Sequence, residues 1–104
     1  MQDKIVKEFL DKISPYKKYF KGIYLFGSRA RGDEKPYSDY DFLLVMPKRD
    51  EKVVDNVYDV VVDTLLDTGK VISLKIFKEE DFKRLSSIPT PFMSRVLKEG
   101  IKYG

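Results

Sequence analysis

The sequence predicts a small α/β domain in which helices pack against one β-sheet. Short apolar runs bounded by glycine or proline alternate along the chain with longer segments whose apolar residues recur every three or four positions, so strands and helices are interspersed. The chain has 104 residues, the size of one domain, and no linker, repeat or low-complexity segment divides it. Hydrophobic residues make up 42% of the sequence, which is enough to bury a core. We therefore expect residues 1–104 to form a single domain.

The N-terminal part predicts a helix followed by a strand. Over residues 3–13 the apolar side chains fall at three- and four-residue spacings with lysines and aspartates between them, which is typical of an amphipathic helix. Ser14-Pro15 ends this helix or restarts it as a short second piece through Tyr19. Residues 22–26 form a short, partly aromatic apolar run between two glycines, which predicts a buried strand.

A polar stretch and a second strand follow. Residues 29–38 contain glycine, proline and several charged side chains, so they predict a loop, or a short helix followed by a loop. Residues 39–46 are apolar apart from two aspartates near their start. They predict a second strand, which Pro47 closes.

The segment 50–67 gives two conflicting signals. Its many valines favour a strand, but four aspartates recur every four residues and would form one solvated stripe on a helix. The periodicity therefore predicts a helix that ends at Gly69. We expect it to bury the apolar residues opposite the aspartates, namely Val53, Val54, Val57, Val61 and Leu65.

The C-terminal third predicts one more strand and two helices. Residues 71–77 are apolar with partial alternation and predict a third strand, and residues 79–85 predict a short helix. Two prolines begin a final helix over residues 92–98, which Gly100 stops. We expect residues 101–103 to be a terminal extension.

Composition excludes several kinds of chemistry. Cysteine and histidine are both absent, so disulfides, thiol nucleophiles, Cys-ligated zinc and imidazole bases are ruled out. Lys+Arg number 20 against 17 Asp+Glu, and the net charge of +3 is too small to indicate nucleic acid, so a nucleic-acid partner is not expected. No targeting segment is recognisable, and no apolar run approaches the roughly 18 residues that span a bilayer. We expect a cytoplasmic protein without a membrane partner.

Two aspartates are the first candidate site residues. Asp39 and Asp41 lie two residues apart on a predicted strand, so both carboxylates project from the same face. Two anions this close repel each other, and each raises the pKa of the other. A divalent cation relieves the repulsion, and oxygen ligands without histidine or cysteine suit magnesium or manganese. We expect Asp39 and Asp41 to bind a divalent metal ion.

A candidate phosphate site precedes this pair. Gly27-Ser28 directly follows a buried strand, where backbone amides can approach an anion closely because glycine has no Cβ. The Ser28 hydroxyl adds a donor, and Arg29 and Arg31 can reach the same charge, although surface pairing with nearby acids is an equal alternative for the two arginines. A phosphate site beside a metal-binding carboxylate pair is what nucleotidyl transfer from a triphosphate requires.

The combined motif resembles a known family. Gly27-Ser28, ten further residues and Asp39-x-Asp41 resemble the signature of the DNA polymerase β superfamily of nucleotidyltransferases. The small size and the sequence Phe-Gly-Ser-Arg-Ala-Arg-Gly resemble its minimal nucleotidyltransferase (MNT) branch, and the resemblance covers nearly the whole chain. It implies an α/β (α+β) fold similar to the polymerase palm, with a small mixed sheet and flanking helices. It also implies transfer of AMP from ATP to a hydroxyl with two Mg²⁺ ions, catalytic and metal-binding roles for Asp39 and Asp41, and nucleotide binding by Gly27, Ser28 and Arg29.

The resemblance further implies a partner and reveals one departure. Many members are similar to antitoxins paired with a HEPN-type toxin, an RNase that some of them silence by adenylylating a tyrosine. Active members carry a third carboxylate on the neighbouring strand, and that position falls on Ser73. Glu79 and Asp63 could substitute only if the fold brings them close. Two functions stay open: an enzyme that transfers AMP to a toxin tyrosine, and an antitoxin with impaired catalysis that neutralises its toxin by binding. The acceptor, the base preference and a homo-oligomeric state also stay open.

Overall fold

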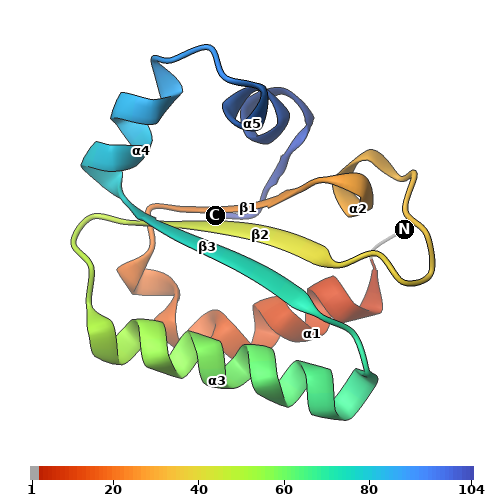
Figure 1. Cartoon of the computed structure of the whole chain (residues 1–104). Helices are drawn as coiled ribbons and strands as arrows, with labels where there is room; N and C mark the ends of the chain where they lie inside the picture. Colours follow the sequence, from red (N-terminus) through yellow and green to blue (C-terminus); the bar gives the residue numbers. More distant parts are fainter. Residues whose placement is uncertain (1–2) are drawn as a thin grey trace.

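A single mixed sheet organises the chain. The computed structural model describes residues 3–104 and confirms the α/β (α+β) class (Figure 1). The sheet has four strands in the order β3-β2-β1-β4. The strand β1 (Gly22–Phe26) is antiparallel to both β2 (Tyr40–Met46) and β4 (Ile101–Lys102), whereas β2 is parallel to β3 (Ile72–Lys78).

Two helices close one face of this sheet, which we call the core face. In Figure 1, α1 (Lys4–Ile13) and α3 (Glu51–Thr68) lie below the strands, and a 3-10 helix over Ser14–Tyr19 follows α1. Alternate residues of β2 point toward these helices and join one large buried cluster. Within this cluster the rings of Phe9 and Phe42 are 4.7 Å apart, and both side chains are fully buried.

The predicted helix boundaries are confirmed by their capping contacts. The Asp3 carboxylate accepts hydrogen bonds from the N–H groups of Ile5 (2.8 Å) and Val6 (3.3 Å), which caps the start of α1. Asp50 caps the start of α3 in the same way. Gly69 adopts a left-handed conformation with φ of 73° and ends α3, as the sequence predicts.

The aspartate stripe of α3 is exposed as predicted, but the buried stripe is shifted. Val53, Val54 and Val57 are buried as expected. Further along, the helix turns Val60 and Thr64 toward the sheet, so the prediction was wrong for Leu65, which is 42% exposed. The buried Thr64 hydroxyl donates to the Val60 carbonyl (2.9 Å), which satisfies this polar group in the core. Val61, also expected in the core, is half-buried.

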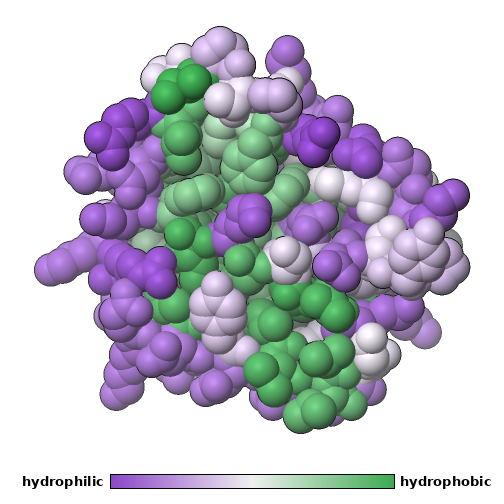
Figure 2. Space-filling model, in the orientation of Figure 1, coloured by the Kyte–Doolittle hydropathy of each residue, from purple (hydrophilic) through white to green (hydrophobic). Residues whose placement is uncertain are grey.

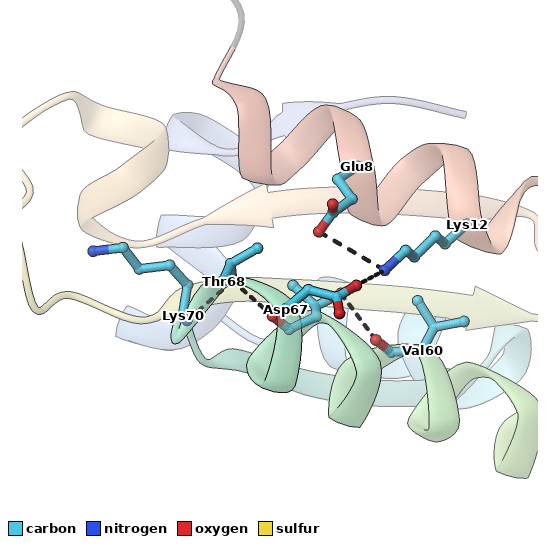
Figure 3. Close-up of polar contacts among 7 residues, drawn as sticks. Glu8, Lys12, Val60, Asp67, Thr68 and Lys70 are labelled. Atoms are coloured by element: carbon cyan, nitrogen blue, oxygen red, sulfur yellow. Dashed lines mark hydrogen bonds and ion pairs between the residues drawn. The ribbon is translucent and has the colours of Figure 1, made fainter.

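The C-terminal half of α3 therefore carries apolar side chains on its outer side. Val62, Leu65 and Leu66 are exposed there, and Figure 2 shows an apolar patch over this part of the molecule. Close by, Lys12 of α1 joins the end of α3, with its Nζ 2.9 Å from the Asp67 carboxylate (Figure 3). This ion pair joins the surfaces of the two helices, whose buried side chains pack in one cluster on the core face.

The other face of the sheet, which we call the cleft face, is covered only in part. The helices α4 (Glu79–Ser86) and α5 (Pro91–Ser94) and a π-helical turn over Arg95–Glu99 lie above it (Figure 1). The fully buried cluster here is small and consists of Phe26, Leu43, Val45 and Val96. Aromatic pairs such as Phe26 with Phe92, at 5.5 Å, extend it.

The remaining differences from the sequence prediction are at element ends. The strand β2 begins at Tyr40, one residue later than expected, and the expected final helix is α5 followed by the π-helical turn. The expected terminal extension contains the strand β4, in which Ile101 pairs with Leu25 of β1. Two residues are too short a run to give a strand signal in the sequence. Between residues 3 and 104, no helix combines the length and apolar character needed to cross a membrane.

Candidate active site

The site begins where β1 ends. Gly27 has φ of 77° and ψ of −160°, a conformation that residues with a Cβ rarely adopt. A Cβ at this position would collide with the Asp41 carboxylate. The short helix α2 (Ser28–Arg31) follows, and the Gly27 carbonyl accepts from the N–H of Ala30 at 3.1 Å. Glycine is thus needed both for the turn and for the close approach of the turn to Asp41.

The pairing of β2 with β3 decides what lies beside Asp41. Asp41 is the register partner of Ser73, so the position where the resemblance implies a third carboxylate is occupied by a neutral hydroxyl next to Asp41. Two residues further along β3, Lys75 projects from the same face. The structure places Ser73 beside Asp41, where the resemblance located it.

Neither alternative carboxylate reaches Asp41. Asp63 belongs to α3, which covers the opposite face of the sheet. Glu79 follows Lys78, whose partner on β2 is Met46, at the far end of that strand from Asp41. Among residues 3–104 no group of three or more acidic side chains could hold a metal ion. A carboxylate site here therefore has two members, Asp39 and Asp41.

Asp41 lies in an environment that disfavours its negative charge. Burial raises its pKa above the ordinary value, and the neighbouring Asp39 raises it further. Lys75, the Ser73 hydroxyl and Arg31 act in the opposite direction, but they do not cancel the effect. Asp39 itself is exposed and precedes β2. The carboxylates of Asp39 and Asp41 are hard oxygen donors, so these two residues fit a divalent cation such as Mg²⁺, which would neutralise the half-buried charge.

A cleft of about 660 Å³ opens beside Asp41, large enough for a small-molecule ligand. It combines the Gly27-Ser28 turn with cationic and aromatic side chains from distant parts of the chain. The lining residues are Phe26, Gly27, Ser28, Arg31, Asp41, Lys75, Phe92, Arg95 and Glu99. Lys75, Phe92, Arg95 and Glu99 could not be identified from the sequence, because only the folded sheet brings the last third of the chain next to residues 26–41.

Arg29 occupies a different place from Arg31. It is not among the residues that line the cleft, and its guanidinium donates to the Ser38 carbonyl at 3.0 and 3.3 Å and to the Pro36 carbonyl at 3.4 Å. The same guanidinium lies over the ring of Tyr40, 4.3 Å from its centroid. Arg29 thus holds the segment that leads into Asp39. Arg31 lines the cleft, as Arg95 does, and its guanidinium pairs with Asp33 at 3.2 Å and with Glu99 at 3.3 Å, which is the surface pairing left open above.

Tyr40, between the two aspartates, is fixed on the core face. Its hydroxyl donates to the Asp3 carboxylate at 2.8 Å, and the same carboxylate caps α1. Burial, aided by the hydrogen bond to Asp3, raises the pKa of Tyr40 to about 12, so the hydroxyl stays protonated as a donor. The backbone that carries Asp39 and Asp41 is therefore anchored through Tyr40 to α1 and through Arg29 to α2.

Comparison with known proteins agrees with this geometry. Residues 8–102 match the family model described as "Polymerase beta, Nucleotidyltransferase", and the chain belongs to this family. It is 38% identical over 100 residues to a Methanocaldococcus jannaschii protein named "Putative protein adenylyltransferase", a match that covers 95% of this chain and 94% of that relative. The expected family is thereby confirmed.

Solved structures share the fold. A crystal structure of a "putative nucleotidyltransferase" from Sulfolobus solfataricus has a TM-score of 0.57 and 24% identity, covering 96% of this chain and 77% of that one. A structure described as a toxin-antitoxin with AMP-PNP has a TM-score of 0.60 and 19% identity, covering 100% of this chain and 74% of that one. The expected small mixed sheet with flanking helices is the fold of this family.

Proposed function

We propose that this domain binds ATP and Mg²⁺ and transfers AMP to the hydroxyl of a tyrosine on a HEPN-type partner toxin. One observation carries the proposal: the desolvated carboxylate of Asp41 lies against the Gly27 turn, inside a cleft that also presents three cationic side chains. The name of the M. jannaschii relative supports adenylyl transfer to a protein, and the structural neighbour with AMP-PNP supports a toxin partner.

Different residues of the cleft contact different parts of the nucleotide. The Gly27-Ser28 turn approaches the triphosphate, and Arg31, Lys75 and Arg95 neutralise its negative charge. The half-buried ring of Phe92 offers an apolar surface to the base. Asp39 and Asp41 would hold Mg²⁺, which when bound supplies positive charge to the phosphate oxygens. In the transfer, the acceptor oxygen forms a bond to the α-phosphorus, and the bond from the α-phosphorus to the oxygen that bridges to the β-phosphate breaks. Pyrophosphate leaves, and the proton of the acceptor hydroxyl passes to water.

Calorimetry tests the binding part of this proposal. The double variant Asp39→Asn/Asp41→Asn should lose Mg²⁺-dependent ATP affinity, because the amides cannot neutralise the cation. A matched control, Asp55→Asn/Asp59→Asn, removes the same charge from the exposed stripe of α3 and should bind as the wild type does. Equal affinity in the wild type and in the Asp39/Asp41 variant would refute the metal site.

The neutral side chain of Ser73 favours a second function, neutralisation of the toxin by binding alone. A serine hydroxyl is a weak base and a poor metal ligand, so no carboxylate at this position takes the proton of the acceptor hydroxyl. Incubation of the domain with labelled ATP, Mg²⁺ and the protein encoded by the adjacent gene, the candidate partner toxin, distinguishes the two functions. Label on the partner supports transfer, whereas toxin inhibition without label supports binding alone.

Ser73→Asp measures how much the missing carboxylate limits catalysis. General-base contributions are typically about 10²- to 10⁴-fold, so the variant should raise the rate of AMP transfer measurably. A third anion should also lower the melting temperature without Mg²⁺ and enlarge the gain when Mg²⁺ is added. Ser73→Asn, of similar size and without charge, is the control. If the wild type transfers AMP as fast as Ser73→Asp, the position does not limit the reaction.

A further inference from the structure

Basic residues gather at the end of the sheet that lies away from the cleft. Because β1 and β2 are antiparallel, the start of β1 lies beside the end of β2, and the Lys21 N–H donates to the Val45 carbonyl at 2.7 Å. The segments 17–21 and 48–52 therefore meet. Their six cationic residues, which we call the basic end, are Lys17, Lys18, Lys21, Lys48, Arg49 and Lys52. Elsewhere in the chain acidic residues slightly outnumber basic ones, so the positive excess is local.

Little of this charge is neutralised by neighbouring side chains. Two acidic residues occur in these segments. The Asp50 carboxylate accepts from the N–H groups at the start of α3, and Glu51 pairs with Arg49 at 2.6 Å. Over residues 3–104, none of the five lysines of the basic end is in an ion pair, whereas Lys7, Lys12 and Lys83 elsewhere are paired. The lysines are exposed and available to an anionic ligand.

A hollow at the basic end adds an aromatic surface to this charge. It measures about 380 Å³ and is lined by Lys18, Tyr19, Pro47, Lys48, Arg49 and Asp50. The Tyr19 side chain is 38% exposed, and the Lys18 Nζ lies 5.4 Å from the centroid of its ring. An exposed aromatic ring between cations is suited to stacking a base while neighbouring phosphates contact the cations. In Figure 1 this end is on the left, whereas α2 and the Gly27 turn are on the right; the left edge is hydrophilic in Figure 2.

We propose that the basic end binds single-stranded nucleic acid. Lys18, Lys48 and Arg49 contact successive phosphates, and one base stacks on Tyr19. This revises the expectation drawn from net charge, because the average over the chain conceals a separation of charge that only the fold produces. The site is separate from the ATP cleft, so its test does not depend on the function proposed above.

Fluorescence anisotropy with a labelled oligouridylate and a labelled oligodeoxyuridylate of twelve nucleotides tests the proposal. We expect a Kd of about 10⁻⁶ to 10⁻⁴ M, weakening with salt by a slope of about −0.7 for each phosphate contacted. The variant Lys18→Ala/Lys48→Ala/Arg49→Ala should weaken binding at least about tenfold and reduce the slope by about 2. Tyr19→Leu should weaken it about fivefold or more without changing the slope. A preference for either oligonucleotide reports whether the 2′-hydroxyl is recognised.

A charge-matched control distinguishes a site from bulk charge. Lys4→Ala/Lys7→Ala/Lys83→Ala removes three exposed cations from elsewhere and should leave the Kd within about twofold. Absence of binding at 50 mM salt, or equal losses in the control and the test variant, would overturn the proposal. Tighter binding of polyglutamate than of either oligonucleotide would also overturn it and assign the basic end to an acidic polypeptide. A wild-type far-UV circular dichroism spectrum and a cooperative thermal melt in both variants show that the domain remains folded, and Lys48→Glu alone repeats the test with a single change.

Discussion

Alternate residues of the same strands point to the two faces of the sheet, and the helices cover these two faces to different extents. Along β2, Phe42, Leu44 and Met46 point to α1 and α3 and are completely buried. On the cleft face the same strand carries Asp41, which is half-buried beside a large opening. The long helices α1 and α3 cover the core face, whereas short helices and a π-helical turn leave much of the cleft face open.

This difference shows how a small domain accommodates a destabilising carboxylate. The neighbours of Asp41 along the strand, Tyr40 and Phe42, are anchored on the core face by Asp3, Arg29 and Phe9. The strand is therefore held from one side while its other side is free to carry charge. We expect substitutions on the core face to affect mainly stability and those on the cleft face to affect mainly binding.

The largest effect should come from the centre of the core face. Phe42→Ala removes a fully buried ring and should lower the free energy of unfolding by about 3–5 kcal/mol, which denaturant titration measures. Phe92→Ala is the counterpart on the cleft face. It should cost clearly less stability, because this ring is half-buried, and it should weaken ATP binding. Equal stability losses in the two variants would contradict the division between the faces.

Two glycines allow a sharper comparison within the cleft face. Gly27 and Gly32 both have positive φ, of 77° and 82°, but their ψ angles differ. Gly32 is in the left-handed helical region, where an alanine should cost about 1 kcal/mol in backbone strain, whereas ψ of −160° places Gly27 in a region almost confined to glycine, where the cost should be about 1–3 kcal/mol. Only at Gly27 does the added Cβ meet Asp41; at Gly32 no atom lies within 4 Å. Gly27→Ala should therefore lose further stability and ATP affinity, whereas Gly32→Ala should keep its ATP affinity. Loss of ATP affinity in both variants would assign the effect to strain in the loop.

Arg29 tests whether anchoring outside the cleft supports the site. Arg29→Ala removes the hydrogen bonds to Ser38 and the contact with the Tyr40 ring, and should lower the free energy of unfolding by about 1–2 kcal/mol. Arg29→Lys keeps the charge but not the planar fork, so it should rescue little. Both the Mg²⁺-dependent ATP affinity and the free energy of unfolding are measured for each variant. Full rescue by lysine would indicate a direct charge contact with phosphate, as the sequence analysis expected.

The local parts of this site could be predicted from the sequence, and the distant parts could not. Gly27, Ser28, Asp39 and Asp41 lie within fifteen residues of each other, and the spacing of the motif identifies them before any fold is known. Arg95 has no such signal, because a lone arginine near the C-terminus gains meaning only where the π-helical turn packs over β1. The significance of Ser73 was inferred only from the family resemblance. The pairing of β2 with β3 shows that Ser73 lies beside Asp41.

The same limit applies to the fold. Helical periodicity identified α3 and its exposed aspartates, but it could not decide between two adjacent apolar stripes. The packing against the sheet buries Val60 and Thr64 and exposes Leu65. This rotation depends on contacts with α1 and β3 rather than on the pattern of α3 itself. The basic end was hidden for a similar reason, since its two segments are distant in sequence and meet only in the antiparallel pair of β1 and β2.

The smallest expected effect is a change in melting temperature that depends on pH through the ionisation of Asp41. Burial, with the charge of Asp39, raises the pKa of Asp41 above the value of 3.8 typical of an unfolded chain. The native protein therefore keeps a proton on this carboxyl over a pH range in which the unfolded chain has lost it. Stability falls as the pH rises from 3.8 through that range, because ionisation is harder in the folded state. At pH 7 the charge of Asp41 is thus destabilising in the absence of metal.

Asp41→Asn should accordingly raise the melting temperature by a few degrees at pH 7 without Mg²⁺. At pH 3 the difference should vanish, since the carboxyl is then protonated in both states and resembles the amide. Asp39→Asn is the control, and its gain should be smaller because Asp39 is exposed. Added Mg²⁺ should stabilise the wild type more than Asp41→Asn and so reduce or reverse the difference at pH 7. Thermal melts at the two pH values, with and without Mg²⁺, give all four comparisons. A lower melting temperature for Asp41→Asn at pH 7 without metal would mean that Lys75, Ser73 and Arg31 stabilise the carboxylate more than burial penalises it.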